Sequence, residues 1–140
     1  MGTLVKIAVI IILSICSSNI RAQEAFSLTV KVENVENNEG KVLIGLYNKA
    51  SDFLDKTFKG QGSEISDNAC EVTFENIPEG TYAVSIFHDE NDNDKLDSNF
   101  IGIPKEDYGC SNNAKGFMGP PKWKDAKFEL KSDRTITITL

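Results

Sequence analysis

The sequence predicts an all-β protein that folds as a two-sheet antiparallel β-sandwich of about seven strands. After residue 22, apolar and polar residues alternate with a period of two in several short segments separated by turn residues. No segment longer than ten residues combines a helical period with caps at both ends. Because short alternating strands have one apolar face each, two sheets packed face to face are the expected solution.

The first two strands are predicted over residues 26–33 and 41–47, where the alternation is clear. The sequence Asn-Asn-Glu-Gly at residues 37–40 provides the turn between them. We therefore expect these strands to form a hairpin.

Residues 48–69 are polar and irregular, and a short helical turn over 51–56 with Ser51 as its cap is compatible with them. Alternation returns at residues 70–74 and again at 81–88. The Pro-Glu-Gly sequence at residues 78–80 predicts a turn, so these strands form the second expected hairpin.

Residues 89–125 are rich in Asp, Asn, Gly and Pro and form a predicted loop far longer than an ordinary hairpin connection. Loops of this size inside a compact domain are usually functional or held by an additional interaction. The last two strands are predicted over residues 126–130 and 135–140, joined by residues 131–134.

The first 22 residues have the pattern of a secretory signal peptide, with Lys6 before an apolar run at residues 7–13. We expect cleavage after Ala22, which leaves one domain over residues 23–140 in a secreted or periplasmic protein. The apolar run is shorter than the about 20 residues of a membrane span. Lipidation at Cys16 is the alternative, but Ile15 is bulkier than the small residue that normally precedes a lipidated cysteine.

The mature chain is acidic. The full sequence has 15 basic and 21 acidic residues, and the leader contributes Lys6, Arg21 and no acidic residue, so 13 basic residues remain and the net charge becomes −8. An acidic surface repels phosphate groups, so nucleic acid and anionic membranes are disfavoured as partners.

Cys70 and Cys110 remain after cleavage of the leader, and an oxidising compartment allows them to form a disulfide. We expect the bridge, while two separately buried thiols are the alternative that the sequence leaves open. Zinc is not expected, because one histidine and two distant cysteines lack the spacing of paired ligands.

The densest group of oxygen donors lies at residues 89–97. Its aspartate and asparagine residues alternate, and a further aspartate follows where a calcium-binding loop has another acidic ligand. Calcium prefers roughly six to eight oxygen ligands, and this spacing wraps several around one point. The predicted ligands are the side chains of Asp89, Asn91, Asn93 and Asp97 and the backbone carbonyl of Lys95.

Two positions depart from the calcium-loop pattern. Asp94 stands where such a loop has a glycine with positive φ, and Phe100 stands where a bidentate glutamate closes the loop. Glu106 and Asp107 are possible replacements for the closing ligand. The alternative is an acidic turn whose side chains bond their own backbone, although repulsion between the carboxylates favours a cation.

His88 is the only histidine and directly precedes this loop. A hydrolase could use His88 with Asp89, but the sequence has no nucleophile motif to accompany them, so we expect no enzyme. Tyr108, Phe117 and Trp123 in the long loop offer a carbohydrate-binding surface as another alternative, although such aromatics more often pack a loop onto the sandwich.

An ordered series of motifs runs through the mature chain, at residues 74–84, 88–91, 95–97, 102–109, 111–114, 119–121 and 125–126. With these motifs the chain resembles the exported bacterial family called domain of unknown function 2141. The resemblance implies a sandwich of the immunoglobulin or transthyretin kind with no established activity. The chain departs from the family pattern at Asp94, where Gly is usual, and at Cys110 and Trp123, where Phe is usual.

These observations predict an exported, non-enzymatic binding or structural module whose long loop is ordered by calcium. Its partner would be a protein or a glycan, and the sequence leaves the oligomeric state open. A carbohydrate-binding module and a hydrolase-like enzyme that uses His88 and Asp89 are the alternatives.

Overall fold

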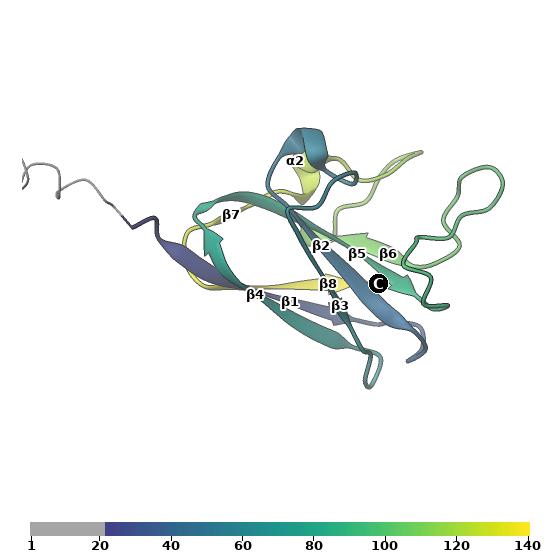
Figure 1. The fold of residues 1–140 in the computed structure, drawn as a ribbon. Coiled ribbons are helices and arrows are strands. Elements are labelled where there is room, and N and C mark those ends of the chain that lie inside the picture. Colours follow the sequence, from purple (N-terminus) through teal and green to yellow (C-terminus); the bar gives the residue numbers. More distant parts are fainter. Residues whose placement is uncertain (1–21) are drawn as a thin grey trace, which may run out of the picture.

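The computed structural model describes residues 22–140 as two β-sheets packed face to face (Figure 1). One sheet has the strand order β4-β1-β8 and the other β3-β2-β5-β6, with β7 also paired to β5. The eight strands are β1 (Ala25–Glu33), β2 (Lys41–Tyr47), β3 (Lys59–Ser63), β4 (Cys70–Pro78), β5 (Gly80–Asp89), β6 (Tyr108–Cys110), β7 (Phe128–Leu130) and β8 (Arg134–Thr139). The predicted all-β sandwich is therefore confirmed.

Alternate side chains of the longer strands point into a common core between the sheets, as the period-two pattern predicts. The core is built from branched aliphatic and aromatic residues with almost no solvent exposure. From β1, β2, β4 and β5 they include Leu28, Val30, Val32, Val42, Ile44, Leu46, Val72, Phe74, Ile77, Tyr82, Val84 and Ile86. Burial of this apolar surface is the main stabilising contribution to the fold.

Both predicted hairpins are wrong. Strand β1 pairs with β4 and β8, and β2 pairs with β3 and β5, so the chain changes sheets between β1 and β2. It changes sheets again between β4 and β5 at the predicted 78–80 turn, where the Tyr82 hydroxyl donates a hydrogen bond to the Pro78 carbonyl at 2.7 Å. A turn signal identifies a reversal of the chain, but strands on either side of it can enter opposite sheets of a sandwich.

Two strands lie in segments for which none was predicted. Strand β3 has the sequence Lys-Gly-Gln-Gly-Ser, which lacks apolar alternation, and it forms one edge of its sheet. Strand β6 has only three residues and pairs with β5 inside the predicted 89–125 loop. Pairing is antiparallel except between β1 and β8, which run parallel.

Within residues 22–140, three short helical segments accompany the strands: the 3₁₀ helices η1 (Ala50–Asp52) and η2 (Ser111–Asn113) and the α-helix α2 (Trp123–Ala126). The predicted turn at 51–56 therefore begins earlier, and Ser51 lies within η1 instead of capping it. Ala126, expected in a strand, ends α2.

None of the helices in residues 22–140 is long and apolar enough to cross a membrane. The predicted signal peptide and Cys16 lie outside the described residues, except for Ala22.

The predicted disulfide is also wrong, because Cys70 and Cys110 are both free thiols. Cys70 begins β4 and packs against the main core, whereas Cys110 ends β6 in the other sheet and packs with Ala83 and Ala126 in a second apolar cluster. Burial raises the pKa of each thiol. The outcome corresponds to the alternative of two separate cysteines.

Candidate cation-binding loop

The loop at residues 89–97 begins where β5 ends, at the opposite end of the sandwich from the start of β1 (Figure 1). Asp89 is fully buried, and its carboxylate organises the loop. Asp89 Oδ1 accepts a hydrogen bond from the Asn93 amide at 3.1 Å, and Oδ2 accepts one from the Asp94 amide at 2.9 Å. Residues 90–94 therefore wrap around the buried carboxylate of Asp89, which accepts hydrogen bonds from two of their backbone amides.

The other predicted side-chain ligands converge on Asp97. The side-chain amide of Asn91 donates to Asp97 Oδ2 at 2.6 Å, and that of Asn93 donates to Oδ1 and Oδ2 at 2.9 and 3.0 Å. The hydrogen bonds from Asn93 and then Asn91 lower the pKa of Asp97. The structure therefore brings Asn91, Asn93 and Asp97 together at one point.

The backbone of the loop adopts the conformation that a calcium-binding loop requires at its glycine position. Asp94 has φ +61° there, and Asp92 has φ +55°. Aspartate is among the few residues with side chains that enter this left-handed region without a large penalty. Asp94 therefore adopts the positive φ that is expected of glycine at this position.

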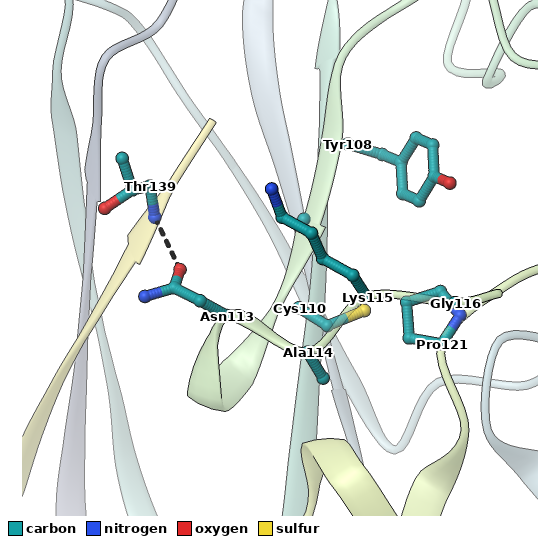
Figure 2. Close-up of a pocket in the computed structure, with 9 residues that line it drawn as sticks. Tyr108, Cys110, Asn113, Ala114, Lys115, Gly116, Pro121 and Thr139 are labelled. Carbon is teal, nitrogen blue, oxygen red and sulfur yellow. Dashed lines mark hydrogen bonds between the residues drawn. The ribbon is translucent and has the colours of Figure 1, made fainter.

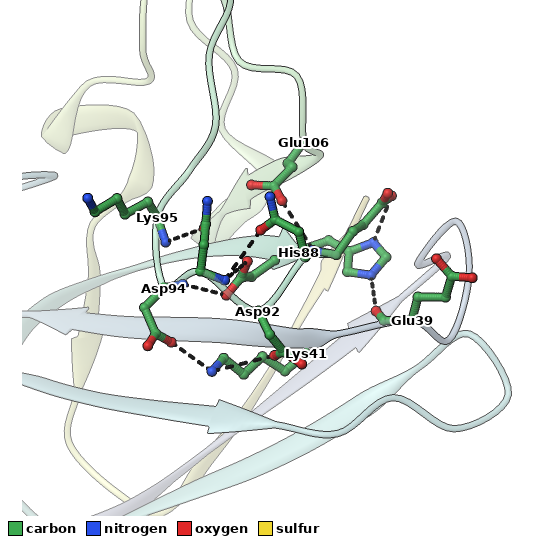
Figure 3. A network of polar contacts seen from close by, with 11 residues as sticks. Glu39, Lys41, His88, Asp92, Asp94, Lys95 and Glu106 are labelled. Atoms are coloured by element: carbon green, nitrogen blue, oxygen red, sulfur yellow. Dashed lines mark hydrogen bonds and ion pairs between the residues drawn. The ribbon is translucent and has the colours of Figure 1, made fainter.

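Lys41 is a member of this site that the sequence interpretation missed (Figure 3). Its ammonium group lies 2.7 Å from Asp94 Oδ1 and 3.6 Å from Asp92 Oδ1. The hydrogen bond with Asp94 raises the pKa of Lys41. Lys41 thus neutralises the two loop aspartates that are outside the predicted ligand set. The pairing of β2 with β5, which places Lys41 opposite Asp89, creates this contact.

Glu106 closes the loop from the other side. Its carboxylate accepts hydrogen bonds from the amides of Glu90 at 3.1 Å and Asp97 at 3.0 Å. Phe100, at the position of the usual closing glutamate, is 99% exposed. Asp107 contributes its backbone carbonyl, which accepts a hydrogen bond from the His88 amide. Of the two possible replacement ligands, Glu106 is therefore the one whose carboxylate contacts the loop.

The predicted calcium ligands offer several oxygen atoms but only two negative charges. Within residues 22–140, no three Asp, Glu, His or Cys side chains lie close enough together to hold a metal ion. A cation in this loop would depend on the two carboxylates of Asp89 and Asp97, on the amide oxygens of Asn91 and Asn93, and on the Lys95 carbonyl. The two amide groups now present nitrogen to Asp97, so each would have to rotate to present oxygen to an ion.

His88 is fully buried at the end of β5 beside the loop (Figure 3). Its Nε2 lies 2.7 Å from the Glu39 carbonyl oxygen, and its Nδ1 lies 3.7 Å from Glu90 Oε1 without a hydrogen bond. Because a carbonyl only accepts hydrogen bonds, Nε2 is the protonated nitrogen. This arrangement fixes the ring between the 37–40 turn and the loop.

The three aromatics considered for carbohydrate binding differ widely in exposure. Trp123 is half-buried and packs edge-on against Phe53, with ring centroids 5.8 Å apart. Phe117 is 93% exposed, and Tyr108 is 42% exposed. Trp123 therefore packs its loop onto the fold, as such residues commonly do.

A comparison with curated proteins and with solved structures gives no match. A family model described as "Uncharacterized protein conserved in bacteria (DUF2141)" matches residues 30–138, from within β1 to within β8. The match includes the whole acidic loop and both sheets. The chain therefore belongs to this bacterial family, domain of unknown function 2141.

Proposed function

We propose that the protein is an exported, non-enzymatic binding or structural module whose 89–97 loop binds calcium. The observation that carries the proposal is the convergence of the Asn91 and Asn93 side-chain amides on the Asp97 carboxylate, while the Asn93 backbone amide donates to the buried carboxylate of Asp89. The signal-peptide pattern of residues 1–22 supports export.

The charge arrangement supports a cation at this position and not elsewhere in the loop. Lys41 already forms ion pairs with Asp92 and Asp94. Within residues 22–140 the Asp97 carboxylate accepts hydrogen bonds only from the side-chain amides of Asn91 and Asn93, and the Asp89 carboxylate only from the backbone amides of Asn93 and Asp94. Calcium would replace the hydrogen bonds between the amides and Asp97 with metal–oxygen contacts. Two carboxylates and no bidentate glutamate favour weak binding, with a Kd of about 0.1 to 1 mM, in the range of extracellular modules.

Calcium titration followed by thermal unfolding tests the proposal. At ten times the Kd, calcium should stabilise the folded state by about 1.4 kcal/mol and raise the Tm by several degrees. The side-chain amide resonances of Asn91 and Asn93 should shift in the same titration, because both groups must rotate.

Two matched variants locate the effect. Asp97→Asn should abolish the calcium-dependent rise in Tm, and Asp92→Asn, which removes the same charge from the same loop, should retain it. If several millimolar calcium changes neither the Tm nor the amide resonances of the unsubstituted protein, the loop is an acidic turn closed by its own hydrogen bonds and the proposal fails.

A further inference from the structure

An apolar hollow of about 900 Å³ lies over the outer face of the β5-β6 sheet. Its floor includes Ser85 and Phe87 of β5 and Tyr108 of β6. Its walls come from two separate parts of the long connection, represented by Ile103 and Met118. Small-molecule sites are commonly concave, mostly apolar and between about 300 and 1,000 Å³ in volume, so this hollow has the size and lining of a ligand site.

The apolar walls of the hollow are unusually exposed. Met118 is 93% exposed, Ile103 is 55% exposed and Ile101, another wall residue, is 64% exposed. These side chains come from two loops and line one hollow, so they are grouped instead of scattered singly over the surface. Clustered exposed apolar residues of this kind mark interaction sites.

A smaller hollow of about 290 Å³ adjoins the first and shares Tyr108, Cys110 and Pro121 with it. Figure 2 shows the Lys115 side chain between Tyr108 and Thr139 in this smaller hollow. Within the described part of the chain, Lys115 forms no ion pair. Lys115 therefore lines the hollow that shares three residues with the apolar one, and no acidic side chain within residues 22–140 pairs with its ammonium group.

The charge around the two hollows is opposite to that of the whole protein. The chain has a formal net charge of −6, but within residues 22–140 no acidic residue lines either hollow. Among the neighbouring loop carboxylates, Asp97 and Glu106 accept hydrogen bonds within the acidic loop. Asp107, which directly precedes Tyr108, is exposed and lines neither hollow. The site therefore favours an apolar body with an anionic end.

We propose that the two hollows together bind a long-chain carboxylate of the fatty-acid type. The alkyl chain would lie in the larger hollow against Phe87, Ile103 and Met118, and the carboxylate would pair with the Lys115 ammonium. This inference rests on the proposed binding function, for which it names a ligand class, but its residues are separate from the calcium ligands.

The test titrates the purified protein with saturated carboxylates of increasing chain length, below their micelle concentrations, by calorimetry. Each added CH₂ should lower the Kd by up to about fourfold until the hollow is full. The primary alcohol of equal length should bind more weakly, and the alkyltrimethylammonium of equal length should bind most weakly. Titrations with excess chelator and with calcium should both show binding, so failure of the calcium proposal and failure of this one are distinguishable.

Matched variants test each half of the site. Lys115→Gln should bring the Kd of the carboxylate close to that of the alcohol, and Lys131→Gln, at an exposed lysine outside both hollows, should leave the preference intact. Ile103→Asp should weaken binding of every chain length at least tenfold. Phe100→Asp, at a 99% exposed residue that does not line the hollow, should have no effect.

Three outcomes overturn the inference. The first is the absence of binding for all chain lengths, and the second is an equal affinity for carboxylate and trimethylammonium head groups. The third is binding to phosphatidylglycerol vesicles that Phe100→Asp abolishes while free carboxylates are not bound. That result would identify the loops as a membrane-docking surface instead of a pocket.

Discussion

The connection between β5 and β7 contains two parts with opposite chemistry. Residues 89–97 are acidic, and their polar side chains are bonded to one another, to the backbone and to Lys41. Residues 98–121 include the side chains with the greatest apolar exposure, among them Phe100, Phe117 and Met118 at 93% or more. The first part is held by polar contacts within the loop and with Lys41 and Glu106, whereas the second displays apolar surface.

Attachment of the second part depends on η2. Ser111 is fully buried, and its hydroxyl accepts a hydrogen bond from the Val84 amide and donates one to the Ala126 carbonyl. Asn113 accepts a hydrogen bond from the Thr139 amide of β8. These bonds join β5, α2 and β8 around one short segment, beside the pairing of β6 with β5 and the apolar contacts of Cys110 with Ala83 and Ala126.

The largest effect is expected from Gly40→Ala, which breaks the base of the acidic loop. Gly40 has φ +65°, and an added Cβ would lie only 2.0 Å from the Asp89 carbonyl oxygen. Steric overlap with backbone in this conformation should cost about 3 kcal/mol of unfolding free energy and lower the Tm by roughly 10 °C. Chemical denaturation measures the free energy, and calcium titration should show that the loop no longer binds.

Gly102→Ala is the matched control in the apolar part. Gly102 has φ +83°, but no atom lies within 4 Å of its added Cβ. Only backbone strain remains, so we expect a loss of about 1 kcal/mol. Equal losses for the two variants would contradict the tight contact between Gly40 and the acidic loop.

Ser111→Ala should give the next largest effect by releasing the apolar part from the sheet. The substitution leaves the buried Val84 amide without its partner, at a cost of about 2 kcal/mol. Hydrogen exchange should accelerate in η2 and residues 114–121 more than in residues 89–97. Ser98→Ala, at an exposed serine, is the control and should leave both parts unchanged.

The longer strands were predictable from the sequence, but β3, β6 and the neighbours of every strand were not. Alternation at residues 26–33 reports which side chains are buried, and the structure buries Leu28, Val30 and Val32 accordingly. The alternation contains no information about the partner strand. The same pattern is therefore compatible with a hairpin to β2 and with the observed pairing to β4 and β8. Cys70 and Cys110 were misassigned for the same reason, because the sequence does not specify their sheets.

The acidic loop was predictable because its oxygen donors are close together in the sequence. The apolar hollow was not predictable, because its lining residues are far apart in the sequence. Leu54, Phe87, Tyr108 and Met118 meet only through the sheet pairing and the path of the loops. One signal was available: large apolar residues at 100, 101, 103, 117 and 118 interrupt a segment otherwise rich in turn formers. Apolar residues in such loops indicate a surface with a use beyond folding.

Substitution of Asp97 should have a smaller effect on stability. It tests whether the side-chain amides of Asn91 and Asn93 hold the acidic loop closed. Its pKa is lowered in the folded state by Asn93 and Asn91, so its stabilising contribution is present above the unfolded pKa of about 4 and is lost as the pH falls through the folded pKa. Without calcium, Asp97→Asn should therefore flatten the decrease in stability at acidic pH. Asn93→Ala should raise the pKa of the Asp97 carboxyl, measured by carbon NMR titration, and an unchanged value would contradict the contact.

The smallest effect on stability is expected from the double substitution of Phe100 and Phe117 with serine. Both rings are more than nine-tenths exposed, so folding removes almost none of their apolar surface from water and provides no hydrophobic stabilisation at these positions. Exposed substitutions away from special contacts usually change the unfolding free energy by less than about 0.5 kcal/mol, and we expect a Tm within roughly 2 °C of that of the unsubstituted protein. Thermal unfolding at several protein concentrations measures this effect and separates folding from association through these rings. A loss of several degrees at every concentration would show that the two rings pack against the sandwich, and the contrast between a self-contained acidic part and an exposed apolar part would then be wrong.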